Sequence, residues 1–167
     1  MAIDSLFVLN SANKTVLEKH WRDDQTTKKA TSIVLPAFLR YLDSLPHKKE
    51  AVPVWLGPAG TACIHVQRND LMYLCTVSSE GGRAGSDVGP LQVLDFLDRL
   101  VENVTEYIGN ATEITIKENF TTVYEASILS EMMDNGNPIT TDIALLKSLV
   151  PMPNLVNRVI ENVTGMG

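Results

Sequence analysis

The chain has 167 residues, of which 44% are hydrophobic and 20% charged, and its 14 Lys and Arg against 20 Asp and Glu give a net charge of −6. This length fits one domain with a core large enough to fold without a disulfide or metal. The negative charge disfavours nucleic acid and anionic lipid surfaces as ligands. The first residues lack the basic and apolar regions of a secretory signal, and no apolar stretch approaches the ~20 residues of a membrane span. We therefore expect a soluble intracellular domain.

The N-terminal segment predicts a β-hairpin. Ile3 to Leu9 is nearly all apolar, which is typical of a strand buried on both faces of a sheet. The turn-forming residues Asn10 to Asn13 follow. Thr15 to Trp21 then alternates between apolar and polar residues, and the sequence of strand, short turn and strand is that of a hairpin.

An amphipathic helix follows the hairpin. From Thr26 to Leu45, apolar residues recur at spacings of three and four, which gives a helix one buried face. Pro36 does not fit, because proline inside a helix removes a hydrogen bond and clashes with the preceding turn. We expect a kink there, or a helix whose regular part starts near Pro36, and we expect the helix to end before Pro46.

Three more strands are expected, over Ala51 to Leu56, Ala62 to Gln67 and Leu71 to Val77. The last two form a second hairpin around Arg68-Asn69-Asp70. The stretch from Ser78 to Asp87 contains three glycines and no core-forming residue, so we expect a flexible surface loop. It lacks the lysine and hydroxyl of a phosphate-binding loop.

The second half predicts helices. The first runs from Pro90 to a stop at Gly109. Three more are expected: one from Ile116 to Met133 that ends at Asp134-Asn135-Gly136, a short one capped by Thr140 or Thr141 and ending at Leu149, and one capped by Asn154. Doubly buried antiparallel strands require helices on both faces. The predicted fold is a three-layer α/β/α sandwich with a five-stranded antiparallel sheet.

Cys63-Ile64-His65 is the most suggestive group for chemistry. It puts a thiol and an imidazole on the same strand face, and with Cys75 and His20 or His47 a zinc site can be drawn. The paired Cys-x-x-Cys of structural zinc sites is missing, and no residue is placed to orient the histidine of a Cys–His dyad. Sheet packing with reduced, buried cysteines is the favoured interpretation. We therefore predict no catalytic residue, no metal site and no cofactor.

The third predicted helix carries several carboxylates. They are Glu113, Glu118, Glu125, Glu131 and Asp134. Acid–base catalysis needs two carboxylates at a defined separation, whereas these spread around several helix faces. A solvated helix surface is the better interpretation.

Two regions of the sequence resemble a known family. Ser5-Leu6-Phe7-Val8-Leu9-Asn10 with Val16 to Trp21 resembles the opening hairpin of the N-terminal longin domain of medium (mu) chains of clathrin-adaptor complexes. Asn119-Phe120, Val123-Tyr124-Glu125 and Glu131 to Pro138 resemble its third helix and the following turn. The turn Asp134 to Pro138 and the stretch from Leu146 to Pro153 look most like the type-3 adaptor complex. The loop from Ser79 to Gly89 is longer than the family leads us to expect.

The resemblance implies a longin fold and a non-catalytic role. Adaptor complexes of this type contain two large chains, one medium chain and one small chain, and sort membrane cargo from the Golgi or endosomes toward lysosomes or the vacuole. The longin domain is an assembly module that packs against the beta large chain. The implied location is cytoplasmic and peripheral on vesicle membranes, without nucleic-acid binding or membrane insertion. Residues 1–150 are then the longin domain, and 151–167 a C-terminal helix with the start of a linker to a separate cargo-binding domain.

The predicted partner surface is the apolar stripe of the last helix. It consists of Leu155, Val156, Val159 and Ile160, and the alternative is that this stripe closes the core. Two other functions stay open. A longin domain from another trafficking protein, such as a longin-type SNARE, would be indicated by a downstream heptad segment. A small enzyme using Cys63 and His65 would be indicated by reaction of the folded chain with a thiol probe.

Overall fold

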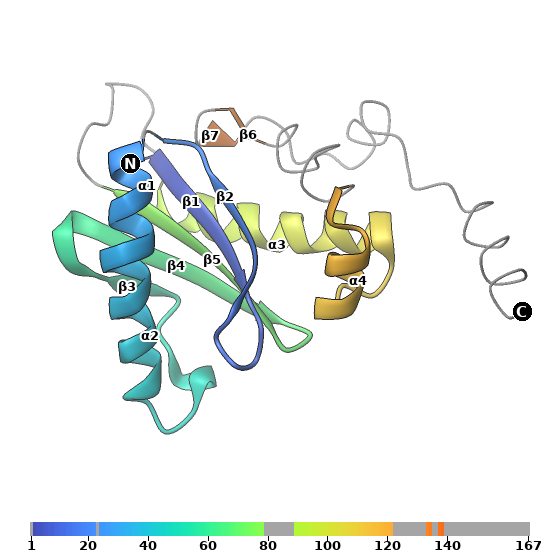
Figure 1. Ribbon diagram of the computed structural model, residues 1–167, viewed down its shortest axis with the longest axis horizontal. Helices are drawn as coiled ribbons and strands as arrows, with labels where there is room; N and C mark the ends of the chain where they lie inside the picture. The colour runs from blue at the N-terminus through green and yellow to red at the C-terminus, as the bar shows by residue number, and fades with distance from the viewer. Residues whose placement is uncertain (1, 23, 79–88, 122–132, 135–136, 139–167) are drawn as a thin grey trace, which may run out of the picture.

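The computed structural model describes residues 2–22, 24–78, 89–121, 133–134 and 137–138 (Figure 1). The elements in these ranges are β1 (Ala2–Leu9), β2 (Thr15–His20), α1 (Asp24–Lys29), the π-helix η1 (Ala30–Val34), α2 (Leu35–Asp43), the 3₁₀ turn η2 (Lys48–Glu50), β3 (Val54–Leu56), the 3₁₀ turn η3 (Pro58–Gly60), β4 (Thr61–Arg68), β5 (Leu71–Ser78), α3 (Pro90–Ile108), α4 (Glu113–Glu118), β6 (Met133–Asp134) and β7 (Asn137–Pro138).

One five-stranded antiparallel sheet organises the fold, with strand order β2-β1-β5-β4-β3. The nearly continuous apolar runs of β1 and β5 occupy central positions, and every residue of β5 is buried. This is the arrangement expected of strands covered on both faces. The predicted five-stranded sheet and both predicted hairpins are confirmed.

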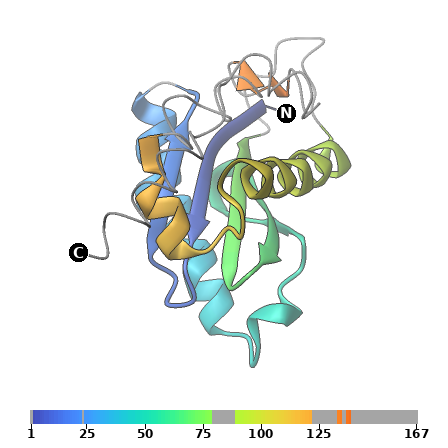
Figure 2. The ribbon, with the colours of Figure 1, turned by 90° about the vertical axis from the view of Figure 1, so that its right-hand side faces the viewer.

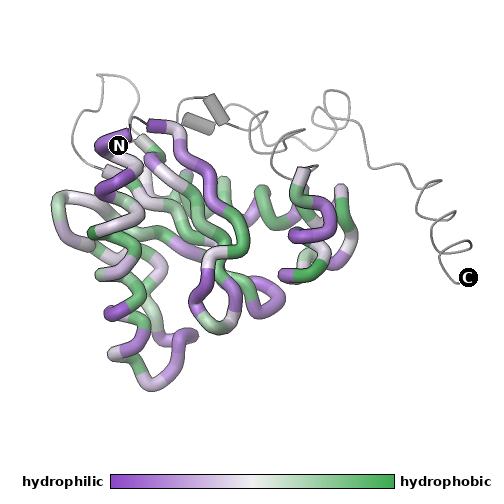
Figure 3. Tube along the Cα trace, in the orientation of Figure 1, coloured by the Kyte–Doolittle hydropathy of each residue, from purple (hydrophilic) through white to green (hydrophobic). Residues whose placement is uncertain are grey.

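Helices cover both faces of the sheet, so the predicted three-layer sandwich is confirmed (Figure 2). On one face η1 and α2 pack on alternate strand residues. Their shared core consists of Phe7, Leu9, Ala30, Val34, Phe38, Leu42, Ala51, Cys63, Met72 and Leu74. On the other face α3 and α4 bury Val93, Phe96, Leu97, Leu100, Val104 and Ile116 against Ile3, Leu6, Val8, Ile64, Tyr73, Cys75 and Val77. In Figure 3 the tube along η1 and α2 alternates between hydrophilic and hydrophobic colours, as a helix with one buried face should.

Pro36 interrupts the first helix as the sequence predicts. The residues just before it form a π-helix, in which the Leu35 N–H donates to the Ala30 carbonyl five residues earlier. Regular α-helix begins at Leu35, so Pro36 lies in the first turn of α2. The helical backbone continues from Val34 into α2, so Pro36, which has no N–H, lies at the junction where the π-helical hydrogen bonds give way to regular α-helix. The helix ends at Asp43, before Pro46.

Two predicted elements are shorter than expected. The strand predicted from Ala51 begins at Val54, because Pro53 precedes it and the Val52 N–H donates to the Tyr41 hydroxyl at 3.1 Å. The helix predicted to run from Ile116 to Met133 is wrong at its C-terminal end. α4 ends at Glu118, the backbone is helical again at Phe120 and Thr121, and residues 122–132 lie outside the described residues. Met133 is not helical, because it pairs in β6 with Pro138 of β7.

Local side-chain chemistry explains where α4 stops. The Asn119 side-chain amide donates to the Thr115 carbonyl at 2.8 Å, and such bonds from asparagine compete with the helix backbone. Asn135-Gly136, which separates β6 from β7 in the sequence, is the commonest dipeptide of two-residue hairpin turns. The loop predicted from Ser78 to Asp87 begins too early, because Ser78 is the last residue of β5 and is buried. The rest of that loop and the helices predicted from Thr140 lie outside the described residues. Among the described helices, none is both long and apolar enough to cross a bilayer.

Candidate functional site

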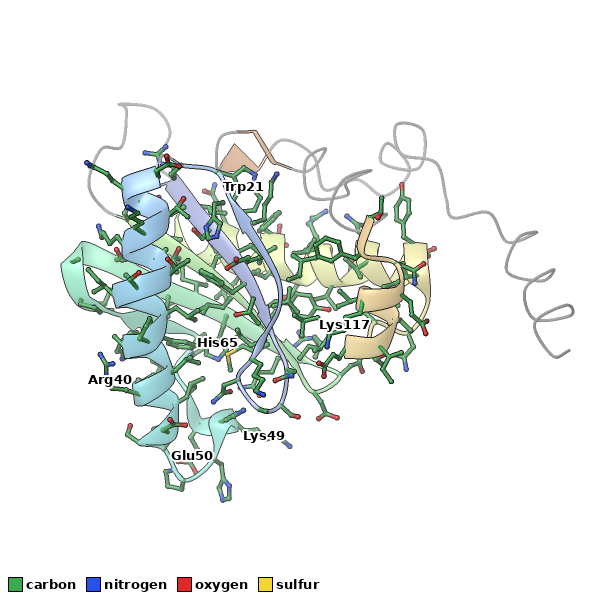
Figure 4. The ribbon with its side chains drawn as sticks, viewed as in Figure 1. Trp21, Arg40, Lys49, Glu50, His65 and Lys117 are labelled. Atoms are coloured by element: carbon green, nitrogen blue, oxygen red, sulfur yellow. The ribbon has the colours of Figure 1, made fainter. Side chains whose placement is uncertain are left out.

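The sheet separates the two cysteines of the predicted chemical group, and the histidine lies on the side of Cys63. Cys63 and His65 are on β4 and face α2, where the His65 ring lies 5.7 Å from the Phe38 ring (Figure 4). Cys75 on β5 belongs to the core under α3. In the described ranges no three His, Cys, Asp or Glu side chains come together as metal ligands would. The structure therefore does not gather the residues of the zinc alternative.

Burial makes both thiols poor nucleophiles. It raises the pKa of Cys63 to about 12 and also raises the pKa of Cys75. A nucleophilic cysteine needs the opposite shift, because the thiolate is the reactive form. Burial also lowers the pKa of His65, whose Nδ1 has no hydrogen-bond partner. The pair has the properties of core residues.

A second arrangement, which the sequence pattern did not reveal, superficially resembles a catalytic triad. Ser5 Oγ lies 2.6 Å from His20 Nδ1, and Glu18 Oε2 lies 3.6 Å from His20 Nε2. The register of β1 and β2 places Ser5 opposite His20. The two residues are 15 positions apart in the sequence, so only the pairing of the strands brings them together. Ser5 is fully buried, so a substrate cannot reach its hydroxyl, and the bond serves to tie β2 to β1.

A buried carboxylate is the other feature that the sequence reasoning missed. Asp4 is 2% exposed, and its Oδ1 accepts a hydrogen bond from Ser78 Oγ at 3.1 Å and lies 3.5 Å from Arg22 Nε. Desolvation raises its pKa, although the bond from Ser78 and the charge of Arg22 act in the other direction. The only sequence feature that indicates this burial is the position of Asp4 inside the apolar run from Ile3 to Leu9. Asp4 joins the ends of β1, β2 and β5 rather than forming a site.

The described carboxylates of the third predicted helix are not paired for acid–base chemistry. Glu113 accepts hydrogen bonds from Lys117 Nζ at 2.8 Å and Asn10 Nδ2 at 3.2 Å, and these bonds lower its pKa. Figure 4 shows Lys117 at the end of the molecule that α4 occupies. Asp134 lies in β6, while Glu125 and Glu131 lie outside the described residues. Glu113 therefore forms a surface ion pair with Lys117 and is not placed to act as a catalytic acid or base.

Two hollows offer little room or chemistry for a substrate. A cavity of about 10 Å³ lies between sheet and helices, about the volume needed for one water molecule. It is lined by Leu6, Val8, Leu17, Tyr73, Leu100, Val104 and Ile116. An open hollow of about 420 Å³ on α3 is lined by Val101, Glu102, Asn103, Thr105 and Glu106. The Thr105 hydroxyl there donates to the Val101 carbonyl, and the lining holds no cysteine or histidine.

The described surface instead exposes apolar side chains. Those with the largest exposure are Ile33, Val52, Leu56, Leu91, Ile114 and Phe120. They lie on separate elements, from η1 to the residues around α4, and single exposed apolar side chains are normal on a protein surface. The predicted partner residues Leu155, Val156, Val159 and Ile160 lie outside the described residues, so their positions stay a prediction.

Comparison with known proteins shows which proteins this chain is similar to. No family model matches the sequence. The chain is 31% identical over 166 residues to AP-3 complex subunit mu-1 of Rattus norvegicus, which is 98% of this chain and 35% of that protein. It is 33% identical over 168 residues to AP-3 complex subunit mu of Dictyostelium discoideum, at 98% and 36% coverage. The chain is a homologue of adaptor-complex mu subunits.

The homology to mu subunits extends to a second complex and to the fold. AP-1 complex subunit mu of Diplobatis ommata is 31% identical over 163 residues, again 98% of this chain. A chain in a homology model of the full-length AP-3 complex, in a stretched open conformation, has the same fold, with a TM-score of 0.61 at 15% identity and 98% coverage of both chains. The chain spans 35% of the length of the first mu relatives it matches.

Proposed function

We propose that this chain is a non-catalytic assembly module of a heterotetrameric adaptor complex in vesicle-mediated protein transport. It packs against the beta-type large chain, and the other large chain and the small chain complete the complex. It acts in the cytoplasm, peripherally on Golgi and endosomal vesicle membranes, in transport toward lysosomes or the vacuole.

The observation that carries the proposal is homology to mu subunits across 98% of the chain. The described core supports the absence of catalysis, because its candidate nucleophiles are buried. Cys63 and Ser5 are fully buried, and the pKa of Cys63 is raised.

Co-expression tests the proposal directly. The chain is expressed with the two large chains and the small chain of the type-3 complex of its own organism, and the complex is purified through a tag on the beta chain. We expect the chain to co-purify at one copy per beta chain. A chain that folds, as shown by circular dichroism, but does not co-purify would overturn the assigned role.

The division of the chain is part of the proposal. Residues 1–150 form the longin domain, and 151–167 form a C-terminal helix and the start of a linker to a cargo-binding domain. Within the helix, the stripe of Leu155, Val156, Val159 and Ile160 contacts the beta chain.

Changing Leu155 and Val159 to aspartate tests this stripe. If it contacts the partner, the variant keeps its thermal unfolding midpoint and loses co-purification with the beta chain. If the variant unfolds, the stripe closes the core. If it both folds and co-purifies, neither role is correct.

A further inference from the structure

The edge strand β3 presents backbone groups without partners. The Gly57 N–H donates to the Thr61 carbonyl at 2.9 Å and the His65 N–H donates to the Pro53 carbonyl at 3.1 Å. In an antiparallel pair, hydrogen-bonded residues alternate with residues whose N–H and C=O point away. With the register Val54↔Ile64 and Leu56↔Ala62, the backbone groups of Val54 and Leu56 therefore point away from β4. In the described part of the chain, no hydrogen bond reaches them.

The side chains on this edge are apolar as well. From Ala51 to Gln67 the sequence contains no Asp, Glu, Lys or Arg. Leu56 is 79% exposed and Val52 is 47% exposed. Proteins usually protect an edge strand with charged residues, because an open edge pairs with other chains. β3 carries no charged residue, and only its short length and the flanking prolines limit pairing at this edge.

The opposite edge of the same sheet, formed by β2, carries charged residues. The Trp21 N–H donates to the Asp4 carbonyl at 3.0 Å, so the Glu18 and His20 backbone groups on β2 point outward by the same alternation. β2 carries Glu18 and Lys19 at this edge. The two edges therefore differ in charge although both are open, and the difference singles out β3.

We propose that β3 is a docking edge for an extended, apolar segment of a partner polypeptide, which adds a sixth strand to the sheet. The segment accepts from the N–H groups of Val54 and Leu56, donates to their carbonyls, and covers the Leu56 side chain. This mode of recognition combines main-chain hydrogen bonds with contacts to alternate side chains. The inference rests on the proposed function, since the segment belongs to a large chain of the adaptor complex.

The length of β3 favours a different polypeptide over a second copy of this chain. β3 has three residues and lies between Pro53 and the Gly57-Pro58 pair. Symmetric pairing of two such strands would join two short segments, and proline restricts pairing beyond them. A longer segment of another chain can extend past β3 onto the neighbouring surface.

Hydrogen exchange of the wild-type protein tests the proposal without a mutation. In the isolated chain, the Val54 and Leu56 amides should exchange at nearly the unprotected rate. In the co-purified complex of the previous section, their exchange should slow at least about 100-fold. Unchanged exchange in the complex overturns the docking edge. Protection in the isolated chain that rises with protein concentration identifies a second copy as the occupant and also overturns it.

A matched pair of proline variants gives a second test. L56P removes one outward N–H and keeps the pairing with β4, and it should weaken association with the complex about tenfold or more. E18P removes an outward N–H from β2 and should leave association unchanged. Equal association of both variants overturns the docking edge while the proposed function stands. Failure of the wild-type chain to co-purify overturns the proposed function, and with it this inference.

Discussion

Phe7 shows how a single side chain connects the sheet to its helical cover. It is fully buried, packs in the core under η1 and α2, and meets the edge of the His20 ring at 5.6 Å. Phe7→Ala should lower the free energy of unfolding by about 3–5 kcal/mol, because the cavity left behind adds to the lost burial. Urea unfolding measures the loss, with the exposed residue change Ile114→Ala as the control. A Phe7→Ala protein that melts within about two degrees of wild type would contradict the core assignment.

His65 should make the protein less stable in mild acid. Its pKa is lowered by burial, so the folded state binds its proton less tightly than the unfolded state, whose pKa is near the ordinary 6.5. The stabilisation is complete above that value and is lost as the pH falls below it, by at most about 1.4 kcal/mol per pH unit. Urea unfolding at about pH 7.5 and about pH 5.5 should show a smaller loss for His65→Leu than for wild type. Equal losses would show that His65 is not the group responsible.

At this scale the sequence predicted apolar burial better than polar burial. The apolar run around Phe7 predicts a buried strand, and that prediction is confirmed. The burial of Asp4 and the Ser5–His20 bond depend on strand pairs from distant segments, and no local pattern encodes them. A polar residue in an apolar run indicates that a partner exists, but the partner emerges only from the register.

Turn residues control how well the β4–β5 hairpin closes. Asn69 and Asp70 both have positive φ, 53° and 61°, as a type I′ turn requires, and this turn prefers Asn-Gly. Asp70→Gly should therefore stabilise the protein by about 0.5 kcal/mol, because relief of the left-handed strain outweighs the added freedom of the unfolded chain. Asp70→Val should destabilise it. Thermal unfolding of the two variants checks the opposite signs, and a shift in the same direction would contradict the turn assignment.

The start of α4 depends on a capping residue. Thr112 Oγ1 accepts from the Thr115 N–H, and Thr115 Oγ1 accepts from the Thr112 N–H at 2.8 Å. Thr112→Ala should cost about 1 kcal/mol, while Thr112→Ser should cost much less because serine retains the acceptor. Chemical denaturation of the two variants tests this difference. Equal destabilisation by both would mean that the threonine methyl group, not the cap, is what matters.

Element boundaries were the least predictable part of the fold. The spacing of apolar residues identified α3 from Pro90 and its end before Gly109, because that helix has one continuous buried face. The break of the third helix at Asn119 was not predictable from apolar spacing, because the side-chain bond to Thr115 that ends α4 leaves no periodic signal. The predicted helix end is wrong only at Met133, which lies in β6. Near Pro36 the sequence predicted a kink or a start of regular helix, and regular helix does begin at Leu35; the π-helix before it was not predicted.

For the whole molecule, the two thiols report on how often the folded core opens. Cys63 and Cys75 lie in the two separate cores and are both buried. A thiol-specific reagent should modify the folded chain at least about 100-fold more slowly than the chain in urea, because reaction requires opening of the core. A kinetic assay at neutral pH gives both rates. Rapid modification of folded Cys63 would support the enzyme alternative and contradict a closed core.

The candidate interface shows where the sequence was least informative. The last predicted helix was chosen for its apolar stripe, and a stripe by itself does not distinguish a partner from a core. The open edge at Val54 and Leu56 was not identified, because an edge strand is defined by which strands lack neighbours. The stretch from Ala51 to Gln67 has no charged residue. It indicates an open edge only when the sheet order shows that β3 is an edge strand and that the other edge strand, β2, is charged.

The π-helix between Ala30 and Val34 has an evolutionary consequence. Its hydrogen bonds span five residues instead of four, so it accommodates one residue more than an α-helix with the same ends. A homologue with uninterrupted α-helix across this region should therefore be one residue shorter, and an alignment should place the gap inside the helix rather than in a loop. Such a homologue should also lack proline at the position of Pro36, because the proline would then lie in the helix interior, where it removes a hydrogen bond and clashes with the preceding turn.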